Sequence, residues 1–232
     1  MRAITIGQAG FDHHFGEYPI TLSQAAKKKQ SRIQTENRSL ILAAALSVFS
    51  TDGYRGATLE RIAERAGMSK TNVLYYFPSK EEIYHTALEQ TVEGWLDPFE
   101  AISAEGDPIE ELRRYISFKL QMSAEQPEAS RLFANEVQRG APLMLEFLQT
   151  RLKTLVDEKA SVIRDWIDEG KLAPVDPYHL IFMIWATTQH YADFDTQIAA
   201  ILGSQTKKVG FHEQAAQAVL SIILNGIRPR EV

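Results

Sequence analysis

The sequence predicts an all-α protein of about nine helices, with a small N-terminal helical head and a larger helical body. Apolar residues recur at helical spacing along most of the chain, and the segments between them begin with helix-capping residues or end with glycine. The sequence shows neither β-hairpin signals nor an internal repeat. We expect an arm over 1–32, a head over 33–80 and a body over 81–232.

Composition limits the function classes that this chain can serve. It has 232 residues, 44% of them hydrophobic, and no cysteine, which excludes disulfides and cysteine-ligated zinc. The apolar run 180–186 is too short to span a membrane and the N-terminus lacks a secretory pattern, so we expect a cytoplasmic protein with no membrane partner. The net charge of −5 argues against binding to nucleic acid, but residues 1–80 carry 11 Lys and Arg against 6 Asp and Glu. A basic head on an acidic body favours contact with phosphates.

The first part of the chain is expected to be an arm followed by one helix. Residues 1–32 combine scattered glycines and aromatics with three consecutive lysines, without any period, which predicts a mobile basic arm. Its cations either reach DNA phosphates or form an ordinary solvated charge run. The next segment, 35–51, has an apolar face at helical spacing, and Asp52-Gly53 ends that helix.

The stretch from Thr58 to Lys80 contains two short helical patterns separated by a tight turn. Thr58 caps the first helix, Gly67 stops it, and Ser69 caps the second. Pro78 then breaks the pattern before the next helix begins. A helix, a turn with glycine and a second helix form the helix-turn-helix layout, in which the second helix enters the major groove of DNA.

The residues GATLERIAERAGMSKTNVLYYFPSKEEIY resemble the DNA-binding signature of TetR-type transcriptional regulators. The resemblance implies phosphate contacts from the hydroxyl before the first helix, the lysine that opens the second, the aromatic pair that ends it, and the lysine after the Pro-Ser turn. Exposed polar side chains early in the second helix, Thr71 and Asn72, are expected to read bases. The alternative is a helical hairpin in an unrelated all-α domain. The predicted DNA-binding residues are Thr58, Ser69, Lys70, Thr71, Asn72, Tyr75, Tyr76 and Lys80.

The body is predicted from the residues that start and stop its helices. Asp107-Pro108 and Asp176-Pro177 each place proline just after a capping aspartate, which marks a helix start. Pro127 and Pro142 mark two more. The expected helices span 81–96, 108–124, 127–139, 142–169, 177–200 and 212–225.

The segment from Leu180 to Ala186 is apolar on every side of its helix. Such a helix is buried all round, either in a thick core or partly in a subunit interface, and this chain is too small for a layered helical core. In TetR-type regulators the last two long helices of each subunit form a four-helix dimer bundle. The resemblance therefore implies a homodimer, whose two recognition helices lie about 34 Å apart, one turn of DNA.

A second set of residues points to a small ligand. Trp185 and Gln189 lie four residues apart on one helical face. Taken alone, Gln189 is explained by a hydrogen bond to another side chain in the core or in a subunit interface, and Trp95 by simple packing. The segments DEKASVIRDWIDEGKLAPVDP and HLIFMIWATTQHYADF, however, are similar to a regulator of pyrimidine use within the TetR family. That resemblance implies a pocket for uracil or thymine formed by Trp95, Trp185 and Gln189.

The sequence thus predicts a DNA-binding regulator, of the repressor type usual in the family, which binds a palindromic operator and responds to a small effector. A different small hydrophobic effector is the alternative within the family. An all-α enzyme is the rival from another class, since His190 and Asp193 resemble a base and its orienter; no nucleophile or phosphate loop accompanies them, so we predict no catalytic residue. A helical scaffold without DNA binding is disfavoured by the basic head. We expect no metal and no cofactor.

Overall fold

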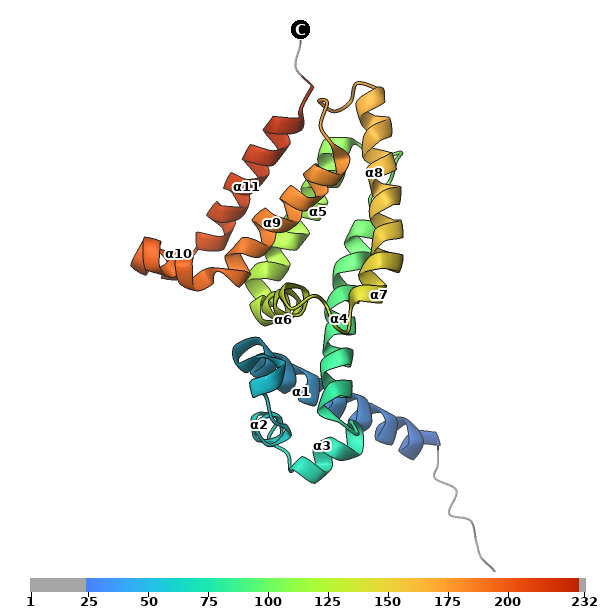
Figure 1. Ribbon diagram of the computed structural model, residues 1–232, viewed down its shortest axis with the longest axis vertical. Helices are drawn as coiled ribbons and strands as arrows, with labels where there is room; N and C mark the ends of the chain where they lie inside the picture. Colours follow the sequence, from blue (N-terminus) through green and yellow to red (C-terminus); the bar gives the residue numbers. More distant parts are fainter. Residues whose placement is uncertain (1–23, 230–232) are drawn as a thin grey trace, which may run out of the picture.

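The computed structural model describes residues 24–229, and within that range it contains helices and no strand (Figure 1). The all-α prediction is confirmed. Three helices form the head: α1 (Gln24–Gly56), α2 (Leu59–Arg65) and α3 (Lys70–Tyr76). α4 (Lys80–Glu100) runs from the head into the body (Figure 1). The body continues with α5 (Pro108–Glu125), α6 (Pro127–Gln138), α7 (Leu145–Phe147), α8 (Lys153–Asp168), α9 (Pro177–Asp193), α10 (Asp195–Leu202) and α11 (Phe211–Ile227).

The head is held together by one face from each of its helices. Ile41 and Phe49 of α1, Ile62 of α2 and Val73 of α3 are fully buried in a shared core, which Ile83 of α4 joins. α1 is kinked at Gly53, whose φ of 65° suits glycine and ends the regular part of the helix where the sequence predicted.

α1 begins earlier than predicted. It starts at Gln24 and not near residue 35, so residues 24–32, expected to belong to the mobile arm, are helical. Alanine, lysine and glutamine, which make up most of this stretch, have high helix propensity, and Arg32 pairs with Glu36 one turn later at 3.3 Å. The remainder of the expected arm, 1–23, lies outside the described residues.

Two predicted body helices are each divided in the structure. The helix expected over 142–169 begins later, after Ala141 takes a φ of 54°, and contains a π-helical turn, η1 (Leu148–Leu152), between α7 and α8. The helix expected over 177–200 ends at Asp193, because Phe194 leaves helical geometry with φ −119° and ψ 29°. Neither glycine nor proline marks this break. A short 3₁₀ turn, η2 (Gly203–Lys207), then precedes α11.

α6 lies at the junction between the head and the body (Figure 1). It packs against α1 of the head and against α5 and α9 of the body, and it also contacts α4. α5, α9 and α11 pack together on one side of the body, with α8 against α9. None of the helices within residues 24–229 is long and apolar enough to cross a membrane.

A buried hydrogen bond joins α4 to α6 at this junction. The Tyr84 hydroxyl donates to Glu136 Oε2 at 2.9 Å, and the backbone N–H of Leu143 donates to Glu136 Oε1 at 2.7 Å. Glu136 is completely buried, so both oxygens depend on these two donors. Burial raises the pKa of Tyr84, and its hydrogen bond to Glu136 raises it further.

Replacing Tyr84 with phenylalanine is expected to lower the free energy of unfolding by roughly 1 to 3 kcal/mol, because Glu136 Oε2 is then left buried without a donor. Urea denaturation measures the loss. Tyr54→Phe is the matched control: Tyr54 packs 4.8 Å from the Tyr84 ring, but its hydroxyl makes no hydrogen bond to a described residue. Equal losses in the two variants would contradict the role assigned to the Tyr84 hydroxyl.

Candidate functional site

The two hydroxyls predicted at the start of the head's short helices cap those helices. Thr58 Oγ1 accepts a hydrogen bond from Arg61 N at 3.2 Å, and Ser69 Oγ accepts one from Asn72 N at 3.1 Å. With Val73 buried, α3 turns the residues of its first turn, Lys70, Thr71 and Asn72, toward solvent. The first turn of α3 is therefore exposed and available for a DNA groove.

Lys70 is held by a surface ion pair. Its Nζ lies 2.7 Å from Glu60 Oε1, and this hydrogen bond lowers the pKa of the Glu60 carboxyl. Both side chains are about half exposed or more. Exposed ion pairs contribute little to stability, so a phosphate can replace Glu60 as the partner of Lys70 at small cost.

The two tyrosines at the end of α3 differ in solvent exposure. Tyr75 is 70% exposed. Tyr76 is half-buried: its hydroxyl accepts from Asn37 Nδ2 at 2.7 Å, and its carbonyl accepts from Arg38 at 2.6 Å. Tyr75 thus projects into solvent, whereas Tyr76 attaches α3 to α1.

Lys80 is engaged within the head. Its Nζ donates to the carbonyls of Tyr54 and Ala57, each at 2.8 Å, and lies 4.4 Å from the centre of the Tyr54 ring. The ammonium therefore satisfies carbonyl groups at the end of α1. A phosphate contact from Lys80 stays a prediction, and it would have to be shared with these carbonyls.

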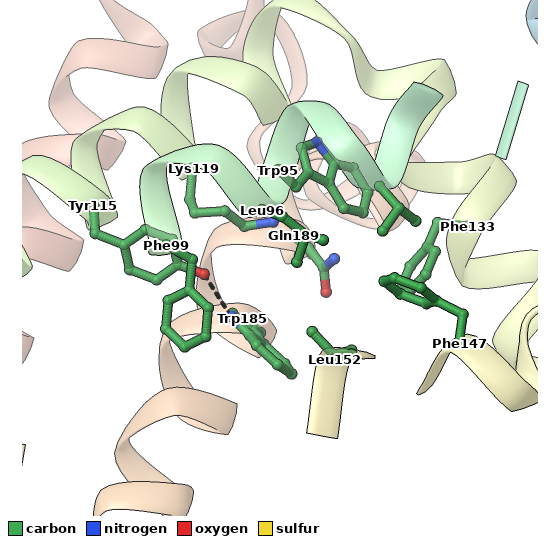
Figure 2. Close-up of a pocket in the computed structure, with 11 residues that line it drawn as sticks. Trp95, Leu96, Phe99, Tyr115, Lys119, Phe133, Phe147, Leu152, Trp185 and Gln189 are labelled. Carbon is green, nitrogen blue, oxygen red and sulfur yellow. Dashed lines mark hydrogen bonds between the residues drawn. The ribbon is translucent and has the colours of Figure 1, made fainter. Parts of the chain in front are cut away.

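The body contains a pocket that brings together the three predicted ligand residues (Figure 2). Trp95 comes from α4, and Trp185 and Gln189 come from α9. The pocket is partly open to solvent and its cavity volume is about 70 Å³, so it has room for a small ligand and not for a drug-sized one. The other lining residues are Val92, Leu96, Phe99, Tyr115, Lys119, Phe133, Phe147 and Leu152.

The predicted ligand residues differ in whether their polar side-chain groups form hydrogen bonds within the protein. Trp185 Nε1 donates to Tyr115 Oη at 2.6 Å, and the Tyr115 side chain is almost wholly buried, which raises the pKa of its hydroxyl. Gln189 makes no hydrogen bond to any described residue and points into the pocket between the two tryptophans (Figure 2). The core hydrogen bond considered for Gln189 is therefore not formed.

Lys119 is the functional candidate that the sequence reasoning missed. It is 4% exposed, lines the pocket, and its Nζ lies 4.2 Å from the centre of the Trp95 ring. Burial lowers the pKa of Lys119 to about 8, with the charge of Asp193 acting in the opposite direction. The available signal was its position in the apolar stripe of α5, between Ile116 and Leu120, where a lone cation is unusual.

The arrangement considered for an enzyme is not assembled. His190 stacks on Phe194, with ring centres 5.0 Å apart, and the Asp193 carboxylate accepts from Ser130 Oγ at 2.6 Å. Burial raises the pKa of Asp193, and the Ser130 hydrogen bond opposes that rise. Across residues 24–229, no group of three His, Asp or Glu side chains could hold a metal ion.

Comparison with known proteins identifies the family. Residues 41–87 match the model described as bacterial regulatory proteins, tetR family, and residues 88–230 match the C-terminal region of YcdC-like proteins. The HTH-type transcriptional regulator RutR of Escherichia coli K12 is 48% identical over 90% of this chain and its own full length. The HTH-type transcriptional repressor NicS of Pseudomonas putida is 28% identical over 58% of this chain and 63% of its own.

Solved structures share the fold. A transcriptional regulator of Streptomyces coelicolor, SCO4942, is 25% identical with a TM-score of 0.65, covering 84% of this chain and 99% of that one. AibR, solved with isovaleryl coenzyme A and operator DNA, has a TM-score of 0.61 at 18% identity, over 80% of this chain and 97% of its own. This chain belongs to the TetR family of bacterial regulatory proteins, and it is a DNA-binding transcriptional regulator.

Proposed function

We propose that this regulator binds a palindromic operator as a homodimer, acts as a repressor in the usual manner of its family, and is modulated by uracil or thymine. The observation that carries the proposal is the pocket in which an unsatisfied amide, Gln189, lies between the indoles Trp95 and Trp185, in a chain 48% identical to RutR. An operator on chromosomal DNA implies action in the cytoplasm.

The chemistry of the pocket suits a flat polar ring. Uracil and thymine present N–H donors and carbonyl acceptors at the ring edge, and a glutamine amide offers one group of each kind. The aromatic side chains around Gln189, among them Phe133 and Phe147, supply faces and edges for packing against the ring. A larger, wholly apolar effector, the alternative within the family, would leave Gln189 and Lys119 buried without partners.

The proposed dimer rests on an apolar surface of the body. Phe182 and Met183 of α9 are 48% and 44% exposed, and Ile222 of α11 is 75% exposed. α9 and α11 pack against each other, so these side chains lie on neighbouring helices. Large exposed apolar surfaces of this kind mark protein interfaces more often than free surface. A second copy of the chain meeting this surface would pair the heads as an operator with two half-sites requires.

Replacing Gln189 with alanine is expected to weaken uracil binding about five- to thirtyfold, because it removes one or two hydrogen bonds of about 1 kcal/mol each. Isothermal titration calorimetry measures the change. Gln121→Ala, an exposed position on α5 outside the pocket, should bind as the parent protein does. Absence of heat with both uracil and thymine, in folded parent protein, would rule out the pyrimidine ligand and leave the hydrophobic effector.

Replacing Lys70 with alanine should weaken operator and non-operator DNA alike, and should reduce the slope of log affinity against log salt by about 0.9 for each lysine lost. Binding titrations over a salt series give the slope. Lys171→Ala is the control, since Lys171 is an exposed lysine in the turn after α8, in the body of the protein. An unchanged slope would remove Lys70 from the phosphate contacts.

Replacing Ile222 with glutamate should separate the dimer, because it places charge in the proposed apolar interface, and should weaken operator binding at least about a hundredfold through the loss of paired heads. Analytical ultracentrifugation gives the mass and gel shift the affinity. Leu145→Glu on α7 is the control: it changes an exposed leucine (47%) away from α9 and α11, and it should alter neither the mass of the dimer nor its affinity for the operator. A parent protein that is monomeric at all concentrations tested would exclude the dimer.

A further inference from the structure

The ligand pocket offers more hydrogen-bond donors than acceptors. Lys119 Nζ has no hydrogen-bond acceptor among the residues whose side chains the structure describes, although the side chain is 4% exposed. Tyr115 Oη already accepts from Trp185 and keeps its own O–H to donate. Gln189 adds the N–H groups of its amide, and its Oε1 is the one lining side-chain oxygen to which no described residue donates.

This surplus restricts the form in which a pyrimidine can bind. A neutral uracil ring presents two N–H donors and two carbonyl acceptors. Gln189 Oε1 can accept from one of the N–H groups, and the other would face donors with no acceptor from the lining side chains, at the cost of an unsatisfied polar group. Loss of the proton from this second nitrogen converts it from a donor into an acceptor, which Lys119 or Tyr115 can then serve.

Given the proposed pyrimidine effector, we propose that binding expels one proton from the pair formed by Lys119 and the ligand, so that Lys119 selects rings by the acidity of their N–H groups. The N–H bond breaks, its electron pair stays on the ring nitrogen, and the proton leaves to the solvent. The nitrogen then accepts a hydrogen bond from the ammonium. In the complex, Lys119 and the ring together carry one proton fewer than the unbound protein and the unbound ligand do at neutral pH.

The charged groups described near Lys119 do not occupy its ammonium, so the ammonium is free to bind an anionic ring. Asp193 is the charged group whose field reaches Lys119, and Ser130 already donates to that carboxylate. Arg131 and His190 act on Asp193 in turn. A charge-assisted hydrogen bond to an anionic ring would therefore provide what the buried ammonium lacks. The groups facing this region are Tyr115 from α5, Ser130 and Arg131 from α6, Gln189, His190 and Asp193 from α9, and the Trp95 ring from α4.

The wild-type protein tests the proposal through proton linkage. Because burial lowers the pKa of Lys119 to about 8, the free pocket holds the ammonium at neutral pH and loses it above pH 8. Uracil affinity should rise about tenfold per pH unit from pH 6 to about pH 8 and then level, as one released proton requires. Calorimetry in buffers of different ionisation heat should count about one proton released per protomer at pH 7.

The acidity of the ligand gives a second measurement. 5-Fluorouracil has nearly the shape of uracil and a more acidic ring, so it should bind more tightly than uracil at pH 6.5. This advantage should shrink at pH 9, where uracil itself loses its proton more easily. An equal affinity for the two rings at pH 6.5 would contradict selection by acidity.

Lys119→Met replaces the ammonium with an apolar chain of similar length. The variant should lose the proton release and the preference for 5-fluorouracil, and it should bind uracil more weakly. Its ligand-free melting temperature should rise, because a largely buried lysine whose ammonium has no acceptor among the described residues is removed. Lys171→Met, at an exposed position, should change none of these quantities. Should Lys119→Met not fold, the wild-type series alone decides the proposal.

The outcomes separate this proposal from the proposed function. Uracil binding with a flat pH profile and heats independent of buffer would overturn the role of Lys119 and leave pyrimidine sensing intact. Proton release that persists in Lys119→Met would assign the proton to another group, such as Asp193, and would also overturn it. Absence of binding by uracil, thymine and 5-fluorouracil at every pH would overturn both.

Discussion

The arrangement of head and body depends on the burial of one carboxyl group. Glu136 is inaccessible to solvent, and its two oxygens take hydrogen bonds from Tyr84 of α4 and from the backbone of Leu143. Because an unsatisfied buried carboxyl is costly, α4, α6 and the turn that follows α6 must keep their relative positions. That turn needs the left-handed conformation of Ala141, with φ 54°, a strained geometry for a residue with a side chain. The junction is thus specified by polar contacts as well as by packing.

The same helix also connects the junction to the pocket. From α6, Ser130 donates to Asp193, and Arg131 donates to the carbonyl of Ala192 and pairs with Asp195 at 3.0 Å. These contacts fix the end of α9 four residues beyond Gln189. α4 supplies the other route, since it carries Tyr84 at the junction and Trp95 in the pocket. A ligand can shift the heads only if it binds one arrangement of these helices better than the other, and both helices that could move with it contact the pocket.

The sequence predicted the features that depend on local chemistry. The side chains of Thr58, Ser69, Asp107 and Asp176 each accept the hydrogen bond expected of a cap, and the apolar periodicity located every helix of the head. The break after Asp193 was missed, because it is stabilised by contacts of α6 with α9 and α10 and not by a glycine or proline. The burial of Lys119 and Glu136 was missed for the same reason, since the helices that cover them lie far away in the sequence.

Two of the buried charged residues, Glu136 and Lys119, differ in how far the fold supplies them with hydrogen-bond partners, and this contrast bears on function. Glu136 is fully provided with donors, as expected for a group that serves structure. Lys119 is 4% exposed and has no acceptor among the described residues, and the pocket around it holds further unused donors. An apolar side chain at this position would make a more stable body, so stability alone does not explain a lysine there. The proposed ligand would explain a lysine at this position. Its ring carries hydrogen-bond acceptors, and one of them would bind the Lys119 ammonium, for which the described part of the fold provides no acceptor.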